Sequence, residues 1–128
     1  MHQDNYLRCA VAQQIYYEKI SGGLDLVNLK YQLKKTCAEC PYTNKTKGWI
    51  GPHASAKEFH DIAVVDQPHP CHVHKRQSCV GNALYMNKLC KMSIDPDKVA
   101  MQRRLREENT EEIIFSWDGQ ALVDFHGK

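Results

Sequence analysis

The sequence predicts a small α+β domain in which helices flank a cysteine- and histidine-rich core and a β-hairpin closes the C-terminal end. Three observations lead to this prediction. The chain has 128 residues, of which 42% are hydrophobic and 25% charged, which suits one globular domain. Five of the six cysteines and five of the seven histidines fall within residues 37–92. Helix-capping residues recur along the chain, and an Asp-Gly pair near its end separates two apolar runs.

Residues 1–36 are expected to form a helical extension of this single domain, which spans residues 1–128. Asp4 can cap a helix whose apolar residues recur at four-residue spacing, and Gly22 would end that helix. The first residues lack a basic flank followed by an apolar stretch, so we expect no secretory signal and a cytoplasmic location. No apolar run approaches the ~20 residues that a membrane-spanning helix needs.

Residues 37–92 should form the core of the domain. Two prolines and two glycines predict a loop over residues 41–52. Ser55 and Glu58 have the spacing of a capping box, which predicts a short helix over residues 56–64. Ser78 can cap a further helix that runs to about Met92.

Residues 93–128 are expected to form a helix and then a β-hairpin. Asp95 followed by Pro96 is typical of a helix start. The apolar runs 113–117 and 121–125 flank Asp118-Gly119, a dipeptide that favours the tight turn of a hairpin.

Two groups of cysteines and histidines have the spacing of metal ligands. Cys37 and Cys40 form a Cys-x-x-Cys pair, whose tight turn brings both sulfurs to one side. The second group lies in another loop and consists of Cys71, His72, His74 and Cys79. In a chain expected to occupy a reducing compartment, such a pattern indicates metal before disulfides.

A four-coordinate site would take the first pair and two ligands from the second group. Cys71 and Cys79 would complete a four-thiolate site, His72 could replace either of them, and His74 is a weaker candidate. Sulfur ligands with optional imidazole favour zinc, or else an iron–sulfur cluster. Cys9 and Cys90 lie in helical patterns and are expected to be core residues.

Enzymatic alternatives have less support in the sequence. A thioredoxin-like use of Cys37 and Cys40 would need a βαβ pattern, which is absent. A zinc-dependent nuclease could draw on His72, His74 and Asn82, but no second Cys-x-x-Cys pair and no His-His dipeptide accompanies them. We therefore expect no catalytic residues, and keep an iron–sulfur redox protein or a zinc-dependent nuclease as alternatives.

Basic and aromatic residues surround the predicted metal site and suggest a macromolecular partner. The candidates for partner or nucleic-acid contact are Lys45, Lys47, Trp49, Lys75 and Arg76. Cations interleaved with an aromatic ring suit a nucleic-acid backbone and its bases. The net charge is only +2, however, and residues 93–128 are acidic, so a protein partner is equally open.

The order of these motifs resembles small uncharacterised cysteine-rich proteins of phages and bacteria. The matching stretches are Cys37-x-x-Cys40-Pro41-Tyr42, Gly48-Trp49-Ile50-Gly51, Pro70-Cys71-His72 and Cys79-Val80-Gly81-Asn82-Ala83. His69 stands where that pattern commonly has an aromatic residue, and Val80 where it has Ala; neither change removes a ligand. The resemblance implies that Cys37, Cys40, Cys71, His72 and Cys79 form one site and that a phage encodes the protein. It implies no activity.

Overall fold

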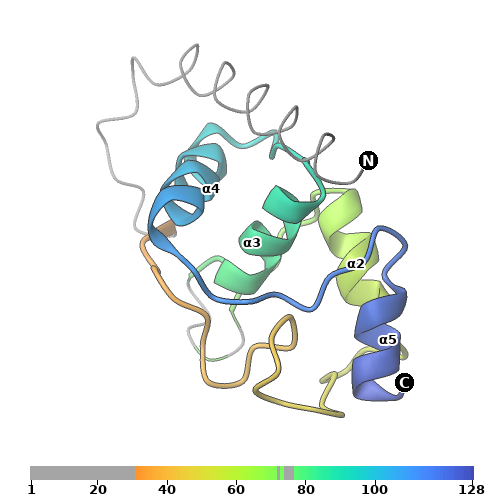
Figure 1. Cartoon of the computed structure of the whole chain (residues 1–128). Coiled ribbons are helices and arrows are strands. Elements are labelled where there is room, and N and C mark those ends of the chain that lie inside the picture. Colours follow the sequence, from red (N-terminus) through yellow and green to blue (C-terminus); the bar gives the residue numbers. More distant parts are fainter. Residues whose placement is uncertain (1–30, 72, 74–76) are drawn as a thin grey trace.

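The computed structural model describes residues 31–71, 73 and 77–128, and within them the fold is helical (Figure 1). The helices are α2 (Lys57–Val64), α3 (Val80–Lys88), α4 (Pro96–Glu108) and α5 (Gln120–His126). No β-strand forms in the described residues, where Pro70 and Ser78 make an isolated antiparallel bridge. The predicted α+β class is therefore wrong for this part of the chain. Most of the predicted helical extension over residues 1–36 lies outside the described residues.

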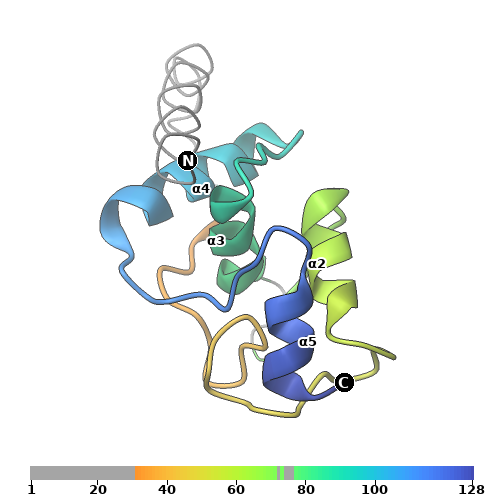
Figure 2. The same cartoon turned by 45° about the vertical axis from the view of Figure 1, so that its right-hand side comes forward.

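Helix α3 is the centre of the structure. All residues from Val80 to Asn87 are buried, although the segment contains a glycine and two asparagines. Helix α3 packs against both α2 and α4, and α5 lies beside α2 (Figures 1 and 2). A helix buried on every side needs neighbours around its whole circumference. The long segment before α2 and the segment between α4 and α5 supply the remaining cover.

Helix α2 begins at Lys57, one residue later than predicted, and its N-cap residue Ala56 makes no side-chain cap bond. The two residues of the predicted capping box still bond to backbone groups at this end. The Ser55 N–H donates to Glu58 Oε2 at 3.1 Å, and the Lys57 N–H donates to Ser55 Oγ at 3.2 Å. Phe59 and Ala63 face the core, as their spacing along the helix predicts.

The start of α4 also confirms the prediction from the sequence. Asp95 caps the helix by accepting the Asp97 N–H at 3.0 Å, and Pro96 occupies the first helical position. Val99, Met101 and Leu105 form its buried side.

Both predicted ends of α3 are wrong. Cys79, rather than Ser78, is the N-cap residue, because its sulfur accepts the Asn82 N–H at 3.4 Å. The helix ends at Lys88 instead of near Met92, and Cys90 follows it with a φ of 60°. A non-glycine residue in this left-handed region cannot continue a right-handed helix.

The predicted C-terminal hairpin is the largest error. Residues 113–116 form no strand and Trp117 begins a turn; this segment runs past α3 from α4 towards α5, and the Ile114 N–H donates to Tyr42 O in the loop before α2 at 2.8 Å (Figure 1). Asp118-Gly119 starts a helix instead of a hairpin turn, because Asp118 Oδ1 accepts the Gln120 N–H and Ser116 Oγ accepts the Ala121 N–H.

Burial explains why the second apolar run becomes α5. Leu122 and His126 are four residues apart and both are buried, which is a helical period rather than a strand period. His126 Nδ1 accepts the Gly48 N–H at 3.1 Å, and His126 Nε2 donates to Pro41 O at 2.8 Å. These bonds attach α5 to the loop that a hairpin would leave uncovered.

Two glycines flank α5 in the same left-handed conformation and allow a matched test. A Cβ at Gly119 (φ 81°) would overlap the His60 side chain, whereas a Cβ at Gly127 (φ 73°) would meet no atom within 4 Å. We expect Gly127→Ala to lower the free energy of unfolding by about 1 kcal/mol, the backbone cost alone. Gly119→Ala should lower it by about 3 kcal/mol, because overpacking adds to that cost. Urea unfolding of both variants measures the difference, and equal losses would contradict the described contact with His60.

Candidate metal centre

The Cys-x-x-Cys pair lies in a tight turn, as its spacing predicts. The Cys40 N–H donates to Cys37 O at 3.3 Å and closes the turn. The Glu39 N–H donates to the Cys37 sulfur and the Tyr42 N–H to the Cys40 sulfur. Backbone N–H groups directed at sulfur favour the thiolate, which is the form that binds metals.

Cys71 and Cys79 lie at the two ends of one loop. Antiparallel backbone bonds hold these ends together: the Cys71 N–H donates to Gln77 O, and the Cys79 N–H donates to His69 O, both at 2.8 Å. Cys79 also caps α3, so its sulfur lies at the positive end of the helix dipole. The loop therefore delivers one thiol beside a helix N-terminus and the other close by.

The four thiols come together as two pairs that cross between the loops. The Cys37 thiol is hydrogen-bonded to the Cys71 thiol, and the Cys40 thiol to the Cys79 thiol. Cys37 also interacts electrostatically with Cys40, and Cys79 with Cys71. All four are free and buried, with exposed fractions between 0 and 8%. Within the described residues, no three His, Cys, Asp or Glu side chains already stand as a coordination sphere.

Burial and pairing shift the pKa values of these thiols in opposite directions. The hydrogen bond from Cys79 lowers the pKa of Cys40, and the same bond raises the pKa of Cys79 well above its ordinary value. Burial raises the pKa of Cys37 to about 11. Within this pair, Cys79 is thus the thiol that donates and Cys40 the sulfur that accepts.

Gly81 makes the close approach of Cys40 to α3 possible. A Cβ at this position would overlap Cys40 Sγ and would lie 3.0 Å from two carbons of Tyr42. The first turn of α3 therefore needs a residue without a side chain where the thiol cluster meets it. The close approach places the Cys40 sulfur against the helix N-terminus, beside Cys79.

Two lysines place positive charge on the two sides of the thiol cluster. Lys45 interacts electrostatically with Cys40, and Lys98 with Cys79. Lys98 is buried, and its Nζ donates to Asn82 Oδ1 at 2.7 Å and lies 3.5 Å from Asp66 Oδ1. Burial lowers the pKa of Lys98, while Asp66 and then Cys79 oppose this effect. Lys98 was not predicted as a site residue, because nothing in a helix pattern marks a lysine as buried.

Lys45 is exposed, with 37% of its side chain accessible, and it is also bonded to several groups of the fold. Its Nζ donates to Thr36 Oγ1 at 2.7 Å, to Thr36 O at 3.2 Å and to Cys37 O at 3.3 Å, and it lies 3.4 Å from Glu111 Oε2. Thr36 also donates its hydroxyl and its N–H to Glu111. These bonds attach Lys45 to the Cys37 turn, and its contact with a partner stays a prediction.

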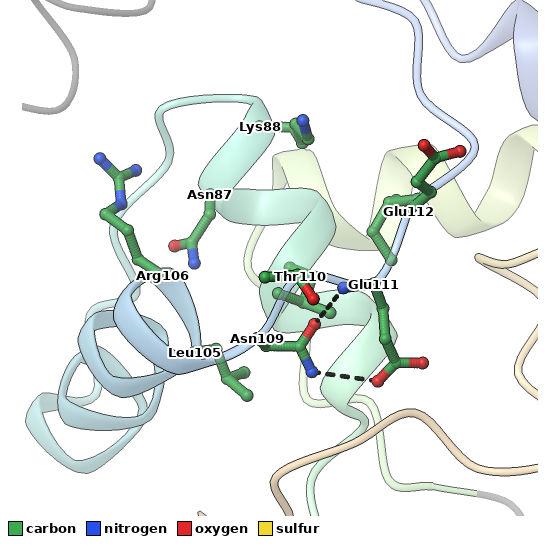
Figure 3. Close-up of a pocket in the computed structure, with 10 residues that line it drawn as sticks. Asn87, Lys88, Leu105, Arg106, Asn109, Thr110, Glu111 and Glu112 are labelled. Atoms are coloured by element: carbon green, nitrogen blue, oxygen red, sulfur yellow. Dashed lines mark hydrogen bonds between the residues drawn. The ribbon is translucent and has the colours of Figure 1, made fainter.

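Glu111 completes this anchor and stays ionised. Burial alone would raise its pKa, but the bonds from Thr36 and Asn109 and the charge of Lys45 together lower the pKa to about 2. Figure 3 shows how Asn109 holds it: the Asn109 amide donates to Glu111 Oε1 at 3.0 Å and Asn109 Oδ1 accepts the Glu111 N–H at 2.8 Å. Asn109 and Glu111 are among the residues that line a hollow of about 360 Å³ between α3 and α4.

The remaining predicted site residues are placed in different ways. Lys47 and Trp49 are exposed on the loop before α2. His72, His74, Lys75 and Arg76 lie outside the described residues. Asn82, the polar residue of the nuclease alternative, is fully buried and bonded to Tyr42 and Lys98. Cys90 follows α3 at the end opposite Cys79, and the nine-residue helix between them is about 13 Å long.

No protein-family model, curated protein or solved structure matches this chain. In the part of the chain that the structure describes, no helix is both long and apolar enough to cross a membrane.

Gly81 gives a test of the thiol cluster that does not alter any thiol. In an open helix, Gly→Ala raises stability by about 1 kcal/mol, because alanine is the better helix former. We expect Gly81→Ala to lower the free energy of unfolding by about 2 kcal/mol instead, since the new methyl group and the Cys40 sulfur overlap. Chemical denaturation measures the change. A stabilised Gly81→Ala variant would show that Cys40 does not approach α3 as described.

Proposed function

We propose that this protein is a small binding module whose four cysteines, Cys37, Cys40, Cys71 and Cys79, hold a structural zinc ion. The observation that carries the proposal is the pairing of the thiols across two loops, Cys37 with Cys71 and Cys40 with Cys79. Buried cysteines that only fill a core have no reason to meet in this way. Four thiols from two loops are the ligand set of a closed zinc site.

The spacing of the thiols favours one ion over an iron–sulfur cluster. Two sulfurs bound to one tetrahedral zinc at ~2.3 Å lie roughly 3.8 Å apart. The two hydrogen-bonded thiol pairs would have to move together to complete this tetrahedron, because no three possible ligands are grouped for a metal in the described residues. A cluster places iron and sulfide between its cysteines and would have to drive the two pairs apart.

The proposed ion has a structural role. Thiolates are its four ligands, so none of its positions is left for the water that a catalytic zinc activates. When bound, zinc would supply folding free energy by joining the two loops. The N–H groups of Glu39, Tyr42 and Asn82 would continue to donate to the thiolates, and Lys45 and Lys98 would offset their charge. A closed site of this kind supports a binding module rather than a nuclease. It also supports four cysteine ligands rather than a site in which His72 is a ligand.

The partner that we propose is a protein. The bonds of Lys45 to Thr36, Cys37 and Glu111 compete with phosphate for one of the cations on which nucleic-acid binding would rest. Trp49 remains exposed, and exposed aromatic side chains are typical anchors of protein interfaces. Nucleic acid is the second candidate, since Lys47 lies beside Trp49 on the same loop.

We further propose that the protein acts in the cytoplasm, that of the host cell if a phage encodes it. The four free thiols suit a reducing compartment. Cys90, expected from the sequence to be an ordinary core residue, is disulfide-bonded, and this points the other way because disulfides rarely persist in a reducing compartment. Phage origin rests on the motif resemblance alone.

Metal analysis of cysteine variants tests the proposal. The purified protein should contain one zinc per chain, and Cys40→Ser or Cys79→Ser should lower the zinc content at least tenfold in the presence of a competing chelator. Cys90→Ser is the matched control and should keep the full zinc content, because Cys90 lies at the far end of α3.

The contrary results are equally clear. A visible absorption band together with bound iron would show that the site holds an iron–sulfur cluster instead of zinc. Loss of zinc in Cys90→Ser, or retention in Cys79→Ser, would show that the ligands are assigned wrongly.

A further inference from the structure

A hollow of about 300 Å³ lies on the surface between α2 and two loops that lead to and from the thiol cluster. We call it the Trp49 groove. Its most informative lining residues are Trp49, Pro52, His53, Phe59, His69 and Pro70. One wall belongs to the loop that follows Cys40, and the other wall directly precedes Cys71. The groove is therefore shaped by the same two loops that the proposed zinc ion would join.

Rings form the floor and sides of this groove. His53 contacts the edge of Phe59 with ring centroids 4.8 Å apart, and His69 meets Phe59 nearly at right angles at 6.1 Å. The His53 and His69 rings are stacked at 6.5 Å with 28° between their planes. These contacts fix three flat surfaces relative to one another.

Trp49 is held in place although 42% of it is exposed. A Cβ at Gly51 would lie 3.3 Å from the Trp49 ring, and Gly51 has a φ of 62°. The indole therefore rests on a stretch of backbone that only glycine leaves open. A large ring that is both exposed and positioned is suited to receive a ligand at little entropic cost.

The lining of the groove indicates what kind of ligand fits. No Lys, Arg, Asp or Glu lines it, and its histidines are His53 and His69. Phosphate groups would find no lysine or arginine among the residues that line it. The spaces between aromatic side chains accept apolar rings. A proline-rich segment presents pyrrolidine rings along an extended chain.

We propose that the Trp49 groove binds a proline-rich segment of a partner protein in the polyproline II conformation. Such a segment has no internal hydrogen bonds, so its carbonyl groups need donors, and aromatic grooves recognise it in this way. Gln67 lines the groove and is exposed, and its side-chain amide makes no hydrogen bond within the described residues. Its amide and the His53 imidazole supply donors next to the ring slots. This inference rests on the protein partner of the proposed function and names its chemistry.

The two tryptophans of the chain allow a direct test. Trp117 is exposed to a similar extent, 46%, but it packs on Phe115 and takes no part in the groove. In a Trp117→Phe variant, Trp49 is the single tryptophan and reports on the groove. Titration of the zinc-loaded variant with a blocked decaproline peptide should shift the fluorescence of Trp49 to the blue and saturate. A glycine–serine peptide of equal length should cause no saturable shift.

Two further variants connect binding to the groove. Calorimetric titration with decaproline should show at least tenfold weaker binding for Trp49→Ala, and unchanged binding for Trp117→Ala. Denaturation curves and zinc content of both variants establish that they fold and carry the metal.

The outcomes separate this inference from the proposed function. A protein that binds zinc but not decaproline, or that binds it equally well after Trp49→Ala, overturns the groove while the metal site stands. Saturable binding of an oligothymidine in place of decaproline overturns it in favour of nucleic acid. A chain that never binds zinc overturns the metal proposal, whatever the peptide result.

Discussion

The fold depends on bringing four buried thiols from two loops to the N-terminus of one helix. Neither loop has a strand or helix of its own to hold it, so contacts at Cys37, Cys40, Cys71 and Cys79 fix its path. Helix α3 starts at this meeting point, and α2 and α4 pack on either side of it. A domain in which described residues form only four short helices gains from a covalent or metal staple, because its apolar core is small.

Two lysines, Lys45 and Lys98, place positive charge near the thiols. Each of them also joins separate segments of the fold. On one side, Lys45 joins Thr36, Cys37 and Glu111, which keeps the first turn against the segment after α4. On the other side, Lys98 connects α4 to Asn82 of α3. A zinc ion with four thiolates would carry two negative charges in excess, and these two lysines would offset them. The same contacts therefore support both the packing of the helices and the binding of a metal.

Local signals in the sequence predicted the structure well where one residue decides the outcome. Asp95 before Pro96, and Ser55 before Glu58, start helices because a side chain satisfies backbone N–H groups within one turn. The Asp118-Gly119 pair failed because its outcome depends on distant residues: Ile114 bonds to Tyr42 instead of to residues 121–125, which are left without a strand to join. Lys45 and Lys98 could not be predicted, since their partners lie far away in the sequence. The spacing of the cysteines located the thiol cluster without any of this information.

The direct test of the zinc centre is X-ray absorption spectroscopy at the zinc edge of the purified, full-length protein. The account predicts a single shell of four sulfur atoms at ~2.3 Å, with no nitrogen or oxygen ligand. A shell of three sulfurs and one nitrogen would assign a histidine in place of one of the four thiols. A shell dominated by nitrogen or oxygen, or a protein that binds no zinc, would contradict the account.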